Sequence, residues 1–141
     1  MSAILIALLT SLLIALPQPA RDLTGTSWQL SAINGGDGKT VTPDDGPKYT
    51  IAFEAFGTLR LRVDCNRGTG NWKSPAAGQL TIGPLAVTRA LCADSLSDRI
   101  LKDIGFVQSY EIKGSRLIMS LGNDRGTYAW EPLGLTSPQA D

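Results

Sequence analysis

Residues 49–64, YTIAFEAFGTLRLRVD, contain two runs in which apolar and polar side chains alternate. The apolar residues that share one face are Tyr49, Ile51 and Phe53 in the first run and Leu59, Leu61 and Val63 in the second. A period of two residues is typical of β-strands that bury one face. The residues EAFG between the runs favour a hairpin, so this stretch predicts two neighbouring antiparallel strands.

The same alternation continues on both sides of this stretch. Further strands are predicted at residues 27–33, 79–83, 85–90, 110–114, 116–121 and 126–131. Glycine or polar residues stand at their boundaries, as short antiparallel connections require. We therefore expect a meander of about seven to eight strands.

One segment, residues 95–107, has helical periodicity instead. Its apolar positions are Leu96, Ile100, Leu101, Ile104, Phe106 and Val107. Ser95 and Asp98 have the form of a capping box, with Asp in place of the usual Glu or Gln. The segment predicts one amphipathic helix whose apolar face closes over the sheet.

Residues 34–48, NGGDGKTVTPDDGPK, form a long connection that is rich in Gly, Pro and Asp. Its aspartates lack the alternating spacing of an EF-hand loop, so no calcium site is predicted. A mobile surface loop is expected instead.

The first 20 residues predict an exported protein. From residue 3 to residue 16 the chain is apolar except for Thr10 and Ser11, and a proline break and a small residue follow. This pattern favours a signal peptide with cleavage after Ala20, although no Lys or Arg precedes the apolar run. The alternative is an uncleaved membrane anchor, for which the run is shorter than the ~20 residues of a spanning helix.

We expect three parts: a signal peptide at residues 1–20, one domain at residues 21–132 and a flexible tail at residues 133–141. No cysteine lies near the leader, so lipid attachment to a mature N-terminal cysteine is not expected. After cleavage the domain would be periplasmic or secreted, without stable membrane insertion.

The composition excludes several kinds of catalytic and metal site. The chain has 141 residues, which suits one domain, and 13 basic residues balance 13 acidic ones, so no nucleic-acid partner is predicted. It contains no histidine, which excludes a Ser-His-Asp triad, a Cys-His dyad and the usual zinc sites. No catalytic, cofactor-binding or metal site is predicted. A hydrolase that uses carboxylates is the alternative, although no pair of acidic residues stands out.

The chain has two cysteines, Cys65 and Cys92. An even and minimal count in an exported chain favours one disulfide bond. A nucleophilic Cys65 would need a nearby base, and no histidine exists to serve; two thiols alone also make a poor metal site. The pair is predicted to tie the end of a central strand to the residues before the helix.

Residues 64–94, DCNRGTGNWKSPAAGQLTIGPLAVTRALCAD, contain in order a Cys-Asn motif, a small-residue turn, a Gly-x-Leu strand and a Thr-Arg-x-x-Cys segment. This order resembles the core signature of the META domain family, also called HslJ-like. The flanks agree, because residues 23–35 resemble the opening strand of the family and residues 110–132 its closing strands.

The resemblance implies a small α+β domain in which a strongly curled antiparallel β-sheet wraps one amphipathic α-helix. No established catalytic reaction comes with the family. Its bacterial members include a heat-inducible protein associated with novobiocin resistance, so we expect a non-enzymatic, monomeric envelope protein in stress or drug tolerance. It would bind a protein or a small apolar ligand, or act as a lipid-binding, chaperone-like module.

Three polar residues, Asn66, Arg67 and Arg89, fall on matching motif positions. They could form a recognition patch for a carboxylate, a phosphate or a partner backbone. The favoured alternative makes Asn66 a turn residue with positive φ and the arginines donors to loop carbonyls. The large apolar residues Trp28, Trp72 and Trp130 could line a ligand groove, but core packing is the favoured prediction.

Overall fold

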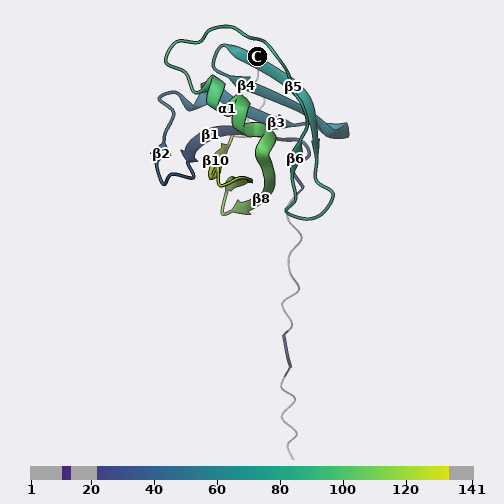
Figure 1. The fold of residues 1–141 in the computed structure, drawn as a ribbon. Coiled ribbons are helices and arrows are strands. Elements are labelled where there is room, and N and C mark those ends of the chain that lie inside the picture. The colour runs from purple at the N-terminus through teal and green to yellow at the C-terminus, as the bar shows by residue number, and fades with distance from the viewer. Residues whose placement is uncertain (1–10, 14–21, 134–141) are drawn as a thin grey trace, which may run out of the picture.

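The computed structural model describes residues 11–13 and 22–133, so most of the predicted signal peptide and of the tail lies outside the described residues. The described chain forms one antiparallel sheet with one short helix (Figure 1). Its strands are β1 (Thr26–Asn34), β2 (Thr40–Val41), β3 (Tyr49–Phe53), β4 (Thr58–Val63), β5 (Asn66–Lys73), β6 (Thr81–Ile82), β7 (Ala86–Val87), β8 (Val107–Lys113), β9 (Arg116–Leu121) and β10 (Thr127–Pro132). The helical segments are α1 (Ser97–Asp103) and the 3-10 turns η1 (Gly46–Lys48), η2 (Ala55–Gly57) and η3 (Ile104–Phe106).

The strand order is β6-β5-β4-β3-β1-β10-β9-β8, with every pair antiparallel. Two runs of consecutive strands, β3 to β6 and β8 to β10, lie on either side of β1. The prediction of a simple meander is therefore wrong at β1. This first strand pairs with β10, the last strand of the chain, and with β3, so both of its edges are hydrogen-bonded inside the sheet.

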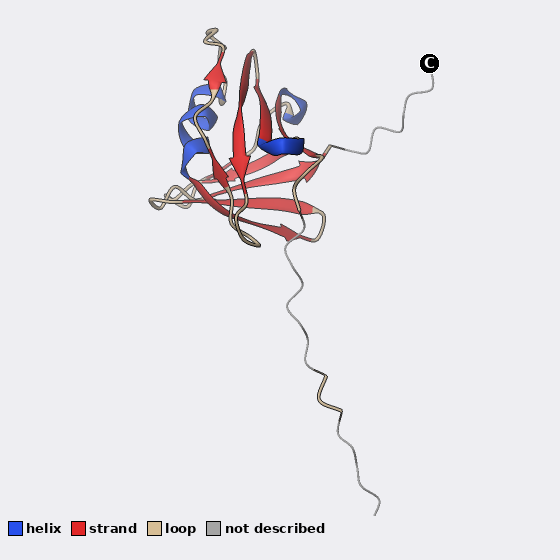
Figure 2. Cartoon of the chain, turned by 90° about the vertical axis from the view of Figure 1, so that its right-hand side faces the viewer, coloured by secondary structure: helices blue, strands red, loops and turns tan. Residues whose placement is uncertain are grey.

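The sheet curls until its two edges nearly meet. The backbone N–H of Leu80 donates to Gln108 O at 3.1 Å, and the N–H of Tyr110 donates to Gly78 O at 2.8 Å. An isolated bridge between Gln79 and Ser109 joins the same segments. Figure 2 shows the strands curving into this near-barrel, with the helical segments at its side. The predicted curled sheet with one helix is confirmed.

Strand β5 differs from the sequence-based expectation. It covers glycine-containing residues for which the motif order suggests a turn, and it pairs with β4 from Asn66 to Asn71 and with β6 at Trp72 and Lys73. Its glycines are explained by a close approach of another segment: a Cβ on Gly70 would lie 2.5 Å from Leu85 Cδ2 and 3.0 Å from Pro84 O. The segment 84–87 can therefore pack directly on the β5 backbone.

The predicted helix is present but begins two residues late. Its N-cap is Leu96 and has no side-chain cap, so the predicted capping box is wrong. Ser95 Oγ instead accepts a hydrogen bond from the N–H of Ser97 at 3.0 Å, and Tyr49 Oη accepts from the N–H of Leu96 at 3.1 Å. The hydroxyl of Tyr49 on β3 thus accepts a hydrogen bond from one of the N–H groups at the start of the helix. Helix α1 lies over one open side of the curled sheet (Figure 1).

The long connection at residues 34–48 is partly regular. It contains η1 and also β2, which pairs with β1 through Val41 opposite Ile33 and Thr40 opposite Asn34. The connection, expected as a mobile surface loop, therefore contains one short strand and one 3-10 turn.

The core fills the inside of the curled sheet. Side chains from every long strand and from α1 contribute to it, and the largest ones that are fully buried are Trp130, Tyr128, Phe53, Leu23, Leu30 and Ile33. The apolar faces predicted for residues 49–53 and 58–63 are buried, as are all three tryptophans. The prediction that the tryptophans are packing residues is confirmed.

Candidate functional site

The predicted disulfide bond between Cys65 and Cys92 is present, with 5.9 Å between the two Cα atoms. Cys65 lies with Asp64 in the two-residue turn between β4 and β5. Asp64, with a φ of 59°, supplies the left-handed residue of this turn, and its N–H donates to Lys48 O at 2.8 Å. The bond therefore attaches the segment before α1 to a tight turn at one end of the barrel.

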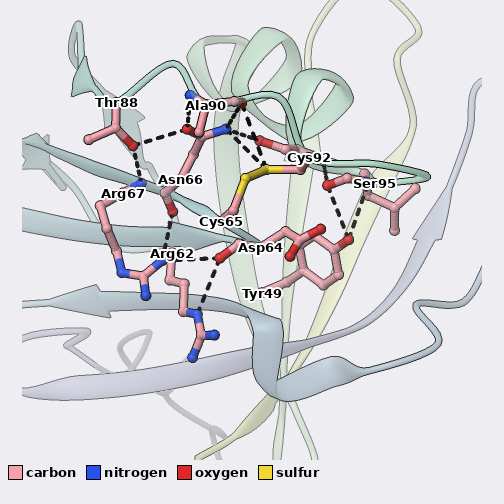
Figure 3. Close-up of a disulfide and its surroundings, with 12 residues drawn as sticks. Tyr49, Arg62, Asp64, Cys65, Asn66, Arg67, Thr88, Ala90, Cys92 and Ser95 are labelled. Atoms are coloured by element: carbon pink, nitrogen blue, oxygen red, sulfur yellow. Dashed lines mark hydrogen bonds between the residues drawn. A yellow bond between two sulfur atoms is a disulfide. The ribbon is translucent and has the colours of Figure 1, made fainter.

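Asn66 is not the turn residue that the sequence suggested. It is the first residue of β5 and only 2% exposed (Figure 3). Its Nδ2 donates to Ala90 O at 3.0 Å, to Ser97 Oγ at 3.1 Å and to Cys92 Sγ at 3.3 Å. Its Oδ1 accepts from the N–H of Ala90 at 2.7 Å and from Thr88 Oγ1 at 3.0 Å. The amide is thus fully engaged in holding residues 88–97 against the sheet.

The two arginines of the predicted patch have different surroundings. Arg67 is exposed, and its Nη1 donates to Asp64 O at 3.0 Å and to Asn66 O at 3.2 Å (Figure 3). Arg89 is also exposed but makes no hydrogen bond or ion pair with the described residues. The three residues do not form one surface, because Asn66 is buried and Arg67 is bound to its own turn.

An open groove of about 660 Å³ lies between α1 and the segment 82–89. This segment covers the outer edge of β5: Gly83 donates its N–H to Asn71 O, and Thr88 donates its N–H to Arg67 O. Pro84 interrupts it between β6 and β7. The apolar side chains that line the groove belong to Ile82, Pro84, Leu85, Val87, Leu101 and Ile104.

Three charged residues also line this groove. They are Arg89 from the segment before the disulfide, and Asp98 and Lys102 from α1. Arg89 and Lys102 are exposed and form no ion pair with the described residues, so the groove has one positive charge in excess. An apolar floor with exposed cations is suited to an apolar molecule that carries a polar or anionic group.

A buried polar cluster that the sequence reasoning missed surrounds Asp103. Its carboxylate accepts from Tyr128 Oη at 2.7 Å and from Arg125 Nη1 at 2.9 Å, and Arg99 Nε lies 3.7 Å away. The Arg125 guanidinium lies 3.8 Å from the centre of the Phe106 ring. Burial, the hydrogen bond to Asp103 and the charge of that carboxylate raise the pKa of Tyr128 far above its usual range.

The sequence did carry a signal for this cluster. Asp103 stands between Ile100 and Ile104 on the apolar face of the predicted helix, and a carboxylate on such a face needs a buried partner. In the structure the cluster ties α1 to β10 and to the turn before it. The Asp103 carboxylate is satisfied within the cluster, whereas Arg125 Nε is buried and has no hydrogen-bond partner among the described residues. Because these bonds tie elements of the fold together, we assign the cluster to stability and not to binding.

Within residues 11–13 and 22–133 no group of three or more His, Cys, Asp or Glu side chains could hold a metal ion. In the same part of the chain no helix is long and apolar enough to cross a membrane.

The sequence profile of the META domain matches residues 21–131. The chain belongs to the META domain family. Among curated proteins nothing matches this chain. The match confirms the resemblance to this family on which the sequence-based prediction rested.

Two solved structures resemble this META domain. The NMR structure of a protein from Burkholderia xenovorans has a TM-score of 0.65 and 18% identity over 84% of this chain and 92% of that chain. The crystal structure of a DUF4847 family protein from Bacteroides vulgatus has a TM-score of 0.57 and 13% identity over 77% of this chain and 93% of that chain. At these identities the likeness shows the fold alone.

The disulfide indicates that this META domain works outside the cytoplasm, because disulfides persist in oxidising compartments.

Asp103→Ala should lower the free energy of unfolding of the META domain by about 3 kcal/mol. The substitution leaves the buried Tyr128 hydroxyl without its acceptor and Arg125 without its carboxylate. We place the effect at the lower end for a broken buried pair because the Arg125 side chain is 32% exposed. Equilibrium unfolding in urea measures it. Asp98→Ala, on the exposed face of the same helix, is the control, and an equal effect of both substitutions would contradict the assignment.

Proposed function

We propose that this META domain protein is an exported, non-enzymatic binding protein of the cell envelope, and that the groove between α1 and the segment 82–89 takes a small apolar ligand. The apolar lining of this groove carries the proposal. Its volume of about 660 Å³ is typical of pockets that bind small molecules. The rim cations Arg89 and Lys102 favour ligands that carry an anionic group.

A small molecule suits this groove better than an added peptide strand. The wall formed by β6 and β7 is interrupted at Pro84, which has no N–H to donate to a new strand. Strands that lie at the edge of a sheet and carry proline resist pairing with further chains. The apolar side chains would therefore provide most of the contact with the ligand.

The groove does not favour the hydrolase alternative. Among its described lining residues Asp98 is the one carboxylate, whereas glycosidase-type chemistry uses a pair. A role in stress or drug tolerance follows if the ligand is a toxic apolar compound that the protein sequesters outside the cytoplasm.

The probe for this proposal is anilinonaphthalene sulfonate, an apolar dye with one negative charge. We expect the folded protein to bind it with enhanced fluorescence, and Leu101→Gln to weaken the affinity about tenfold, which corresponds to about 1.4 kcal/mol. Leu101 lines the groove, so the substitution places an amide in the apolar floor. A fluorescence titration measures the change.

Leu91→Gln is the matched control, because Leu91 lies outside the groove lining and is fully exposed. Both variants should unfold cooperatively, since partly unfolded proteins bind the same dye. The proposal fails if the folded protein does not bind the dye, or if the two variants weaken binding equally.

A further inference from the structure

Phe56 is the most unusual surface residue of the domain. It lies in η2, at the tip of the hairpin between β3 and β4, and its relative exposure is 104%. Its backbone has a φ of 60° and a ψ of 24°, in the left-handed region that bulky residues rarely adopt. A folding requirement would favour glycine or asparagine at this position, so neither burial nor backbone geometry explains a phenylalanine here.

Strand pairing places Phe56 at the end of the barrel where the domain begins and ends. Thr26, the first residue of β1, is opposite Phe53, the last residue of β3. Pro132, the last residue of β10, is opposite Trp28, and the N–H of Leu133 donates to Ser27 O. The chain therefore enters and leaves the domain beside the Phe56 hairpin. We call this the hairpin end.

The same end carries lysines. Lys73 is the last residue of β5, and Lys113 is the last residue of β8, before the turn that leads to β9. Both are exposed and form no ion pair with the described residues. The other charged side chains at this end include two pairs, Arg60 with Glu54 and Arg116 with Glu131. With Asp22 and the exposed Glu111 also counted, the charges at the hairpin end balance, and Lys73 and Lys113 are the cations there that no described carboxylate pairs with.

From these observations we propose that the hairpin end lies against the surface of an anionic lipid bilayer, with the Phe56 ring in the interface and Lys73 and Lys113 near the headgroups. An exposed aromatic ring beside lysines is typical of interfacial contact. The apolar run of residues 3–16 comes shortly before the chain enters this end. An uncleaved run would hold this end of the domain close to the bilayer.

A protein partner suits the hairpin end less well. A stable interface of standard size buries about 800 Å² on each partner around an apolar centre. Among the described residues at this end, the exposed large hydrophobic side chains are Phe56 and the partly exposed Leu133. A single protruding ring can insert into the fluid interface of a lipid bilayer. A protein partner would need a larger apolar patch, because one ring covers only a small part of a standard interface.

The test uses the protein as isolated from the envelope of expressing cells, in the F56W variant, with vesicles of phosphatidylglycerol and phosphatidylcholine. Some vesicles contain lipids with brominated acyl chains, which quench tryptophan fluorescence at the interface. The three native tryptophans are buried, and the emission of the unsubstituted protein is subtracted. We expect brominated lipids to cause a marked loss of the additional F56W emission.

L91W is the matched control. Leu91 has a relative exposure of 101%, and it adjoins Cys92 of the disulfide at the opposite end of the barrel. Its additional emission should be unaffected by brominated lipids. Equal losses in both variants would mean that no end of the domain is preferred, and an F56W emission that brominated lipids do not change would mean that the hairpin end does not touch the bilayer. Either result overturns the proposal, and neither bears on the groove.

Discussion

Asn66→Ala should lower the free energy of unfolding by about 4 kcal/mol, since five hydrogen bonds of roughly 0.5–1.5 kcal/mol each are lost and buried partners remain unsatisfied. Ser97 is itself buried, so its hydroxyl cannot form a hydrogen bond with solvent water in place of Asn66. Equilibrium unfolding in urea measures the loss as a lower midpoint.

Asn71→Ala is the matched control for this prediction. Asn71 lies on the same strand and is exposed, so its substitution should change the free energy of unfolding by no more than about 0.5 kcal/mol. Asn66→Asp adds a further check, because a carboxylate keeps the acceptor but loses the donors to Ala90 O and Cys92 Sγ. If Asn66→Ala were as mild as Asn71→Ala, the amide would not be what holds residues 88–97.

The strands β3 and β4 could be predicted because their signal is local. Each buries every second side chain, and that alternation is visible in the sequence itself. Strand β5 has few such side chains. Its glycines are needed because Leu85 packs against the backbone at Gly70, a contact between residues 15 positions apart that no local pattern reveals. For the same reason the pairing of β1 with β10 was not predicted.

In the candidate site, too, some features have a local signal in the sequence and others depend on contacts between distant residues. The disulfide could be predicted from a count of two cysteines and an exported leader. The role of Asn66 could not, because its side-chain partners lie 22 to 31 residues further along the chain. Arg67 does donate to a carbonyl of its turn, whereas Arg89 lines the groove. The sequence alone could not distinguish these two roles, because they depend on the path of the chain around β5. Asp103 was within reach of sequence reasoning, since it stands on an otherwise apolar helix face.

Cys65→Ser combined with Cys92→Ser should lower the free energy of unfolding by about 3.5 kcal/mol, the value that the chain-entropy model gives for a loop of this length. The bond closes a loop with a sequence separation of 27, and its absence leaves the unfolded chain freer. The measurement is urea unfolding of the variant, of the oxidised protein and of the reduced protein. The reduced protein should match the variant. An unfolding midpoint that reduction leaves unchanged would contradict the prediction.

A combination with Asn66→Ala separates the effect of the disulfide on the unfolded chain from its effect on the native one. If the bond acted on the unfolded chain alone, the two losses would add, because the hydrogen bonds of Asn66 form in the native state. However, both features hold the same segment, and Asn66 Nδ2 contacts Cys92 Sγ at 3.3 Å. Without the bond residues 88–97 should be held less tightly, and the amide should then contribute less. We therefore expect a combined loss smaller than the sum by about 1 kcal/mol. Strict additivity would show that Asn66 positions the segment by itself.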